Sequence, residues 1–346
     1  MKKINWKKLL NVVFLIAVFS VTMLIVFDGE DFGQVLDYIQ TASLIYVIPS
    51  IACVFLFVMG EGVIIWYLFR KLGVNASFYR CCLYSGIGYF YSSITPSASG
   101  GQPLQIVAMR KDRIPVAMSL SVLGIIAITY KVVLVALGAV ILILRPAAVM
   151  DFLEPVEFLV YLGMTLNVVT IVVLLLLVFR PNIVRRFLHW VIRIVHKIRP
   201  FRNLQRQHDR IENLATQYQG AADFFRSHKG VIVKVILINA LQRFSLLVVT
   251  WLTYCSFSLE GSTFPQITSL QGMIHLSADM MPLPGGMGIS ETMFLDIFRP
   301  IFGDDLVLPG MVISRGISFY AQVLISALMT IIASFTTKER RGRKKK

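Results

Sequence analysis

The sequence predicts an all-α polytopic membrane protein with about six full spans and two re-entrant helical hairpins in an inverted-topology repeat. Of its 346 residues, 56% are hydrophobic and only 15% are charged, whereas an ordinary soluble domain has about 25% charged residues. The apolar residues form runs long enough to cross a bilayer, and basic residues gather between alternate runs. This pattern excludes a soluble enzyme, a disordered chain and a disulfide-rich secreted domain. It also excludes a β-barrel, whose strands would alternate in polarity.

The first element is an apolar run that follows four lysines in residues 1–8. A signal peptide begins in the same way, but its apolar core is shorter and leads to small residues at a cleavage site. Here Asp28 and Glu30 follow the run, so we expect an uncleaved span. Because a bilayer core requires about 20 apolar residues per helix, full spans are predicted at 9–27, 43–69, 114–144, 158–179, 231–258 and 308–335.

Two further apolar stretches, residues 82–109 and 266–300, are interrupted near their middles by proline and glycine. These residues break helices, and broken backbone at membrane depth is tolerated only inside protein or beside a wet cavity. We therefore predict two re-entrant hairpins. The expected break residues are Pro96, Gly100, Gly101, Gln102 and Pro103 in the first hairpin and Pro282, Pro284, Gly285, Gly286 and Gly288 in the second.

The charge of the loops predicts the orientation. With the N-terminus in the cytoplasm, the segments expected on the cytoplasmic side hold 28 of the 34 Lys and Arg residues, and the outer segments hold Arg145 and Arg299. This distribution follows the positive-inside rule if each hairpin returns to its own side, and it predicts that both termini are cytoplasmic. We therefore assign the net charge of +15 to the membrane surface rather than to nucleic acid.

The predicted elements repeat within a single transmembrane domain, residues 1–346. Half one, residues 43–144, and half two, residues 231–335, each contain a span, a hairpin and a span, in opposite orientations. Paired broken segments in inverted halves indicate a transporter-type site near the midplane. Between the halves, the cytoplasmic segment 180–230 is predicted to contain a basic amphipathic helix on anionic inner-leaflet lipid. The alternative is a solvated helix beneath the bundle. The sequence leaves open whether the chain forms a homo-oligomer.

Charged side chains interrupt the apolar runs, although each costs roughly 2.5–3.5 kcal/mol at the bilayer centre. One interpretation is that they form buried pairs that hold the bundle together. The functional interpretation is a hydrated cavity, because both hairpins would direct a helix N-terminus at the midplane and such termini bind phosphate. The predicted substrate-binding residues are Lys131, Arg243 and Arg315, which would hold a phosphate, and Glu61, Asp279 and Glu291, which would balance charge.

Catalytic chemistry has no comparable signal in the sequence. The four cysteines lie in apolar stretches and lack the spacing of a zinc site or a disulfide framework. No nucleotide-binding motif is present. We therefore predict no catalytic residue, no metal and no cofactor, and we expect membrane phospholipids as partners.

Two motifs resemble those of a known family. Residues 282–291 read Pro-Leu-Pro-Gly-Gly-Met-Gly-Ile-Ser-Glu and residues 95–103 read Thr-Pro-Ser-Ala-Ser-Gly-Gly-Gln-Pro. They resemble the flippase-like membrane region of lysylphosphatidylglycerol synthase, the multiple peptide resistance factor, in which an acid is usual at the place of Gln102. The resemblance covers nearly the whole chain. Full-length members add a soluble domain that transfers lysine from lysyl-tRNA to phosphatidylglycerol.

This chain ends at Lys346, soon after its last predicted span, so the resemblance implies a stand-alone member that translocates lipid. The implied substrate is a phospholipid or a lipid-linked headgroup such as lysyl-phosphatidylglycerol, and the implied place is the cytoplasmic membrane of a bacterium or archaeon. One alternative is a phosphatidylglycerol lysyltransferase, or a component of lysyl-phosphatidylglycerol synthesis that confers cationic peptide resistance. Another is a secondary transporter of a small anion.

Overall fold

The computed structural model describes residues 32–95, 98–179, 218–281 and 286–342, together with residues 216 and 283. Within these ranges the regular structure is helical and no strand occurs, which confirms the predicted all-α class. Five helical segments are long and apolar enough to cross a membrane: Leu44–Lys71, Val116–Leu144, Ala147–Val178, Lys229–Ser256 and Asp304–Thr336. They match five predicted spans. The predicted span 9–27, and segment 180–230 apart from residues 216 and 218–230, lie outside the described residues.

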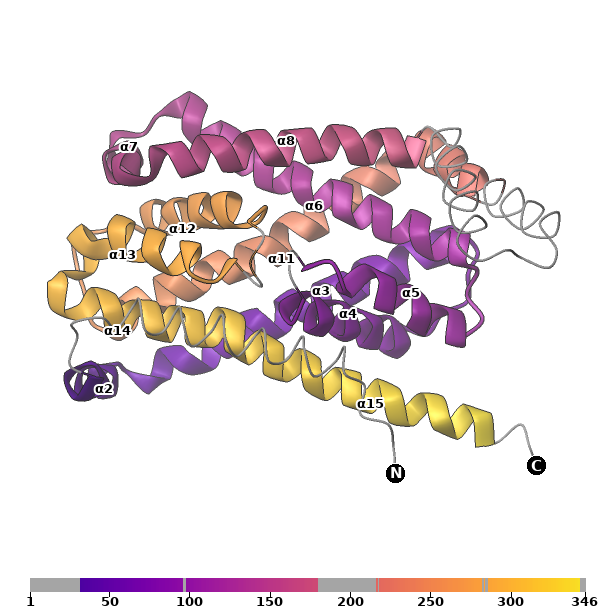
Figure 1. Ribbon diagram of the computed structural model, residues 1–346, viewed down its shortest axis with the longest axis horizontal. Coiled ribbons are helices and arrows are strands. Elements are labelled where there is room, and N and C mark those ends of the chain that lie inside the picture. Colours follow the sequence, from indigo (N-terminus) through magenta and orange to yellow (C-terminus); the bar gives the residue numbers. More distant parts are fainter. Residues whose placement is uncertain are drawn as a thin grey trace, which may run out of the picture.

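The helices follow one another in an order that alternates long and short elements (Figure 1). They are α2 (Phe32–Thr41), η1 (Leu44–Tyr46), α3 (Val47–Lys71), α4 (Phe78–Ser93), α5 (Gly101–Lys111), α6 (Val116–Leu144), α7 (Ala147–Leu153), η3 (Glu154–Val156), α8 (Glu157–Phe179), α11 (Lys229–Ser256), α12 (Phe264–Ala278), α13 (Ile289–Phe302), α14 (Asp304–Arg315), η5 (Gly316–Ala321) and α15 (Gln322–Gly342).

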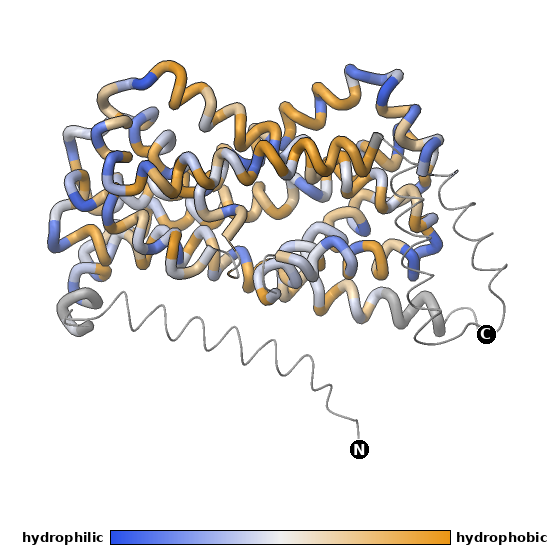
Figure 2. Tube along the Cα trace, turned by 45° about the horizontal axis from the view of Figure 1, so that its top comes forward, coloured by the Kyte–Doolittle hydropathy of each residue, from blue (hydrophilic) through white to orange (hydrophobic). Residues whose placement is uncertain are grey.

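The long helices run lengthwise through the molecule, which therefore has two ends (Figure 1). One end, the basic end, carries Lys71 at the end of α3, Lys111 at the end of α5 and Lys229 at the start of α11. The opposite, acidic end carries Glu157 at the start of α8 and Asp304 at the start of α14. Figure 2 shows hydrophilic residues concentrated at both ends and hydrophobic ones along the middle. This separation is what a bundle that crosses a membrane requires.

The two predicted hairpins form as pairs of short helices. The α4–α5 pair enters from the basic end and the α12–α13 pair from the acidic end (Figure 1). The second pair turns through Gly286 and Gly288, whose φ angles are +68° and +85°, a backbone region that glycine adopts far more readily than other residues. Of the predicted break residues, Pro96, Pro282, Pro284 and Gly285 lie outside the described residues.

The element order of α3–α6 recurs in α11–α15, with the direction between the two ends reversed (Figure 1). The long helices that open the two series, α3 and α11, pack closely against each other. An added Cβ on Gly60 of α3 would lie 2.8 Å from Cγ of Gln242 on α11. The Gln242 amide also donates a 2.7 Å hydrogen bond to the carbonyl oxygen of Phe57. The grouping of these elements into two repeat halves of one domain stays a prediction.

The last span, predicted at 308–335, contains a wider helical turn near its middle. A π-helix, η5, occupies Gly316–Ala321 between α14 and α15. Such wider turns are rare and occur frequently at functional sites. Here the π-helix follows directly after Arg315 and places Ser318 and Phe319 on a cavity wall.

Candidate substrate cavity between the hairpins

A cavity of about 620 Å³ lies where the broken ends of the two hairpins meet. Ser99, Gln102 and Pro103 line it from the first hairpin, and Gly286 and Ser290 from the second. Further lining residues come from α6, α8 and η5, among them Leu123, Leu174 and Phe319. Five of the six predicted substrate-binding residues line the cavity, namely Glu61, Lys131, Arg243, Asp279 and Arg315, while Glu291 is not among its lining residues.

The first pair of opposite charges joins α6 to the end of α12. Lys131 Nζ forms an ion pair with Asp279 Oδ2 and donates a 2.9 Å hydrogen bond to Asn167 Oδ1 on α8. The hydroxyl of Tyr130 donates to Asp279 Oδ1. Because the Lys131 side chain is 8% exposed and that of Asp279 is 16% exposed, each charge is neutralised at the edge of the cavity rather than by bulk water.

The second pair lies within the second half of the chain. Arg315 Nε donates a 2.8 Å hydrogen bond to Glu291 Oε1, and the hydroxyl of Ser290 donates one of 2.8 Å to Glu291 Oε2. Glu291 is 2% exposed and sits in the first turn of α13, where the partial positive charge of a helix N-terminus favours an acid. The pair thus fixes the start of α13 against the last span.

Glu61 of α3 contacts an amide rather than a base. Gln105 Nε2 on α5 donates a 2.6 Å hydrogen bond to Glu61 Oε1 and a longer one, 3.2 Å, to the carbonyl oxygen of Tyr84. Gly88 of α4 makes room for this amide, since a Cβ there would lie 2.1 Å from Gln105 Nε2. Glu61 therefore ties the first hairpin to α3.

Arg243 of α11 is held by aromatic rings. Its guanidinium carbon lies 3.7 Å from the ring centre of Tyr130 and 4.8 Å from that of Phe57. Such cation–π contacts stabilise a cation away from bulk water. Among the described residues Arg243 makes no ion pair, and its buried Nε has no hydrogen-bond partner. In this respect it differs from Lys131 and Arg315, which both contact acids.

Comparison with models of known protein families assigns the chain to one family. Residues 9–326 match the model of a family described as the lysylphosphatidylglycerol synthase TM region. The chain belongs to this family. No curated protein matches it. As a member of the lysylphosphatidylglycerol synthase TM family with five described apolar spans, it is a multi-pass membrane protein that contacts phospholipids and has a function related to lysylphosphatidylglycerol.

Several polar residues of this family member were not singled out from the sequence. Asn167 is fully buried, receives the Lys131 ammonium and donates a 3.0 Å hydrogen bond to the carbonyl oxygen of Leu276. Gln105 and Tyr130 contact Glu61 and Asp279. A usable signal existed, because an uncharged polar side chain inside an apolar span must also find a partner.

A second cluster outside the cavity was also missed. At the basic end, Arg80 of α4 donates to Asp112 through Nε, at 2.7 Å, and to Thr336 of α15 through Nη1, at 2.8 Å. Arg80 is 8% exposed. These bonds connect the start of α4 to the residue after α5 and to the last span, at the basic end of the first hairpin.

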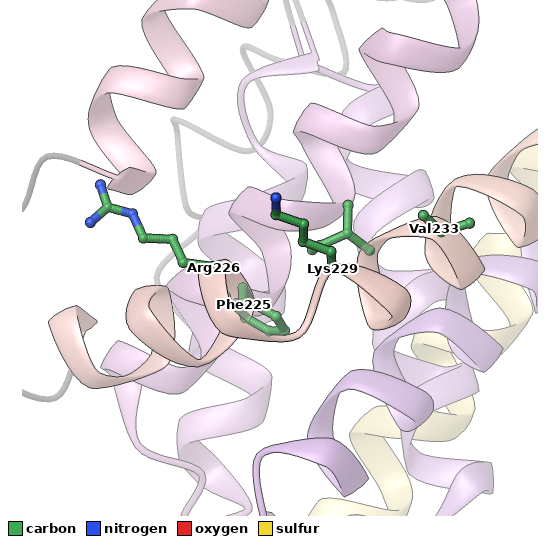
Figure 3. A pocket seen from close by; sticks show the side chains of 5 residues that line it. Phe225, Arg226, Lys229 and Val233 are labelled. Carbon is green, nitrogen blue, oxygen red and sulfur yellow. The ribbon is translucent and has the colours of Figure 1, made fainter.

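A surface groove of about 450 Å³ lies where the chain enters α11, lined by Phe225, Arg226, Lys229, Ile232 and Val233. Figure 3 shows the long side chains of Arg226 and Lys229 extending to the same side, with Val233 farther along α11. Two cations above apolar side chains suit the boundary between headgroups and acyl chains. This part of segment 180–230 is compatible with the predicted contact to anionic lipid, which stays a prediction.

Proposed function

We propose that this protein translocates phospholipids, lysyl-phosphatidylglycerol among them, between the leaflets of the cytoplasmic membrane, with both termini in the cytoplasm. One observation carries the proposal: a cavity between two oppositely oriented broken hairpins is lined by charged side chains inside an apolar bundle. A lipid headgroup that crosses a bilayer must give up water, and a single charge at the centre costs roughly 2.5–3.5 kcal/mol. Charged groups in a cavity at that depth lower the barrier.

The composition of the cavity wall also favours an amphiphilic substrate. The hairpin ends contribute polar and charged groups. Apart from Tyr130 and Lys131, the lining side chains of α6 and α8 are apolar and include Leu123, Ile126 and Leu174. A small soluble anion would gain no binding energy from contact with the apolar side chains. A phospholipid would place its headgroup at the hairpin ends and its acyl chains along the apolar helices.

A headgroup phosphate would compete with the acids of the two ion pairs for the basic side chains. A phosphate that approaches Lys131 or Arg315 must displace Asp279 or Glu291 as the partner of that base. Exchange of one anionic partner for another changes the net charge of the cavity by at most the charge of the substrate. In this proposal the acids keep the empty site neutral, and the bases provide a bound state for the phosphate.

The test is reconstitution of the purified chain into liposomes that contain headgroup-labelled phosphatidylglycerol or lysyl-phosphatidylglycerol. We expect the wild type to expose inner-leaflet label to a membrane-impermeant quencher and Arg315→Ala to expose only the outer-leaflet label. Arg299→Ala is the matched control, because Arg299 is an exposed arginine at the acidic end that pairs with Asp304 and does not line the cavity. Wild-type quenching equal to that of empty liposomes for both lipids would count against the proposal.

Two assays separate the alternative functions. Transfer of lysine from lysyl-tRNA to phosphatidylglycerol by the purified chain would indicate a lysyltransferase. Uptake of labelled phosphate into the same liposomes, without movement of labelled lipid, would indicate a small-anion transporter. For the proposed translocator we expect neither signal.

A further inference from the structure

Two buried polar atoms on the cavity wall have no hydrogen-bond partner among the described residues: Nε of Arg243 and Oε1 of Gln271. Across the described residues one further buried side-chain atom shares this property, Oγ of Ser326, which does not line the cavity. Unpaired buried polar atoms are rare because each loses its hydration without compensation. A donor and an acceptor left unpaired in one cavity indicate a ligand that supplies the opposite groups.

The donor is a charged group placed for anion binding. The rings of Tyr130 and Phe57 hold the guanidinium of Arg243 at 3.7 and 4.8 Å, and Glu61 and Asp279 line the same cavity. No acid contacts it directly within the described part of the chain. A guanidinium whose Nε–H has no partner among the described residues matches an oxygen of a phosphate.

The acceptor lies on the neighbouring helix. Gln271 of α12 is 5% exposed and shares the cavity wall with His275 and Asp279, one and two turns farther along the same helix. The carbonyl oxygen of its amide can only accept, so it requires an O–H or N–H group. A phosphate oxygen does not meet that requirement, because it is an acceptor itself.

We propose that Arg243 and Gln271 form a two-point site for one phospholipid headgroup. Arg243 binds an oxygen of the phosphodiester, and Gln271 Oε1 accepts a hydrogen bond from a hydroxyl or ammonium group of the same headgroup. The inference rests on the proposed function and deepens it, because it selects headgroups that carry a donor. Ethanolamine, glycerol and aminoacyl headgroups carry one, whereas the quaternary ammonium of choline has no N–H.

The experiment measures binding by calorimetry with detergent-solubilised full-length protein. Dihexanoyl-phosphatidylethanolamine and dihexanoyl-phosphatidylcholine are the paired probes, because both are zwitterionic and only the first has an ammonium donor. We expect the wild type to bind the ethanolamine lipid about threefold to tenfold more tightly, which is the range of one net hydrogen bond. Free phosphoethanolamine, which has the same headgroup without acyl chains, should bind much more weakly.

Three variants assign the two contacts. Arg243→Gln is expected to weaken both lipids about tenfold or more, since a hydrogen bond to a charged group is lost. Gln271→Leu is expected to remove the preference for ethanolamine and to leave binding of the choline lipid within about twofold. Lys234→Gln is the matched control, because Lys234 is an exposed base on the same helix that does not line the cavity.

Equal affinity of the wild type for the two lipids overturns the inference without any variant. So does an Arg243→Gln protein that binds both lipids as the wild type does. Phosphoethanolamine that binds as tightly as the lipid would assign the site to a soluble phosphate ester instead. Because no transbilayer movement is needed, selective binding without translocation would refute only the proposed function. Translocation that is as fast in the Arg243→Gln and Gln271→Leu variants as in the wild type would refute only this inference.

Discussion

The two hairpins share a plan but are stabilised by different forces. The broken end of α12–α13 is buried: Met287, Ser290 and Glu291 are each less than 5% exposed, and Glu291 pairs with Arg315. Phe294, Phe298 and Phe302 then pack together along α13. The broken end of α4–α5 is open, since Ser99, Gln102 and Pro103 are exposed. Its helices depend on hydrogen bonds and on contacts that only glycine allows.

This difference shows how an inverted arrangement can provide one fixed and one exposed cavity wall. The second hairpin carries an acid in the first turn of its inner helix and has a base to match it. The first hairpin carries the neutral Gln102 at its inner helix start, and the base of its half, Lys131, pairs across with Asp279 of the second hairpin. The charge that is absent from one hairpin is therefore supplied by the other.

The largest expected effect is in the second hairpin. Arg315→Leu leaves the buried Glu291 without its cation, and breaking a buried ion pair in this way costs about 3–5 kcal/mol. We expect a clear loss of thermal stability in detergent. The double variant Arg315→Leu with Glu291→Leu should recover most of it, because no uncompensated charge remains. A double variant as unstable as the single one would show that the ion pair is not what fixes this hairpin.

The matching change in the first hairpin should be milder. Gln105→Leu removes the donor to Glu61, and a hydrogen bond to a charged group contributes about 1.5–3 kcal/mol. The same substitution at the exposed Gln102, three residues earlier on α5, is the control and should leave the melting temperature unchanged. Equal losses at the two positions would mean that the Glu61 contact does not anchor the hairpin.

Close contacts of a glycine within the first hairpin predict a loss of stability similar to or smaller than that of Gln105→Leu. A Cβ on Gly101 would lie 2.6 Å from the carbonyl oxygen of Gly88, and overpacking against backbone costs about 1–3 kcal/mol. We expect Gly101→Ala to lower the melting temperature. Gly230→Ala is the control, because a Cβ at Gly230 meets no heavy atom within 4 Å. The comparison fails if Gly101→Ala is as stable as Gly230→Ala.

The smallest effect is expected at the exposed tip. Gln102→Glu adds an acid to the first hairpin at an exposed position, where substitutions usually change stability by less than about 0.5 kcal/mol. The reverse exchange in the second hairpin, Glu291→Gln, removes the buried negative charge that pairs with Arg315 and should be clearly destabilising. Thermal unfolding of the two variants side by side checks this, and similar losses would refute the contrast between an open and a buried tip.

The sequence by itself determined the five described spans and both hairpins, but not the short helices α2 and α7 or the π-helix η5. Apolar runs in a membrane protein must be helices, because no water is available to pair the backbone. Clusters of proline and glycine interrupt those helices, because proline has no N–H to donate and glycine has the most backbone freedom to lose. The five described spans and both hairpins follow from these local rules. The six charged residues were also found from the sequence, since a charge inside an apolar run is conspicuous wherever the run ends up.

Only the tertiary structure decided which groups meet. Lys131 contacts Asp279 across 148 residues of sequence, whereas Arg315 contacts an acid of its own half. Arg243 has two aromatic rings as neighbours and no acid in contact among the described residues. Pairing depends on how helices distant in the chain rotate and pack against one another. Periodicity and spacing report the face of a single helix, but they do not report which residue of another helix lies opposite that face.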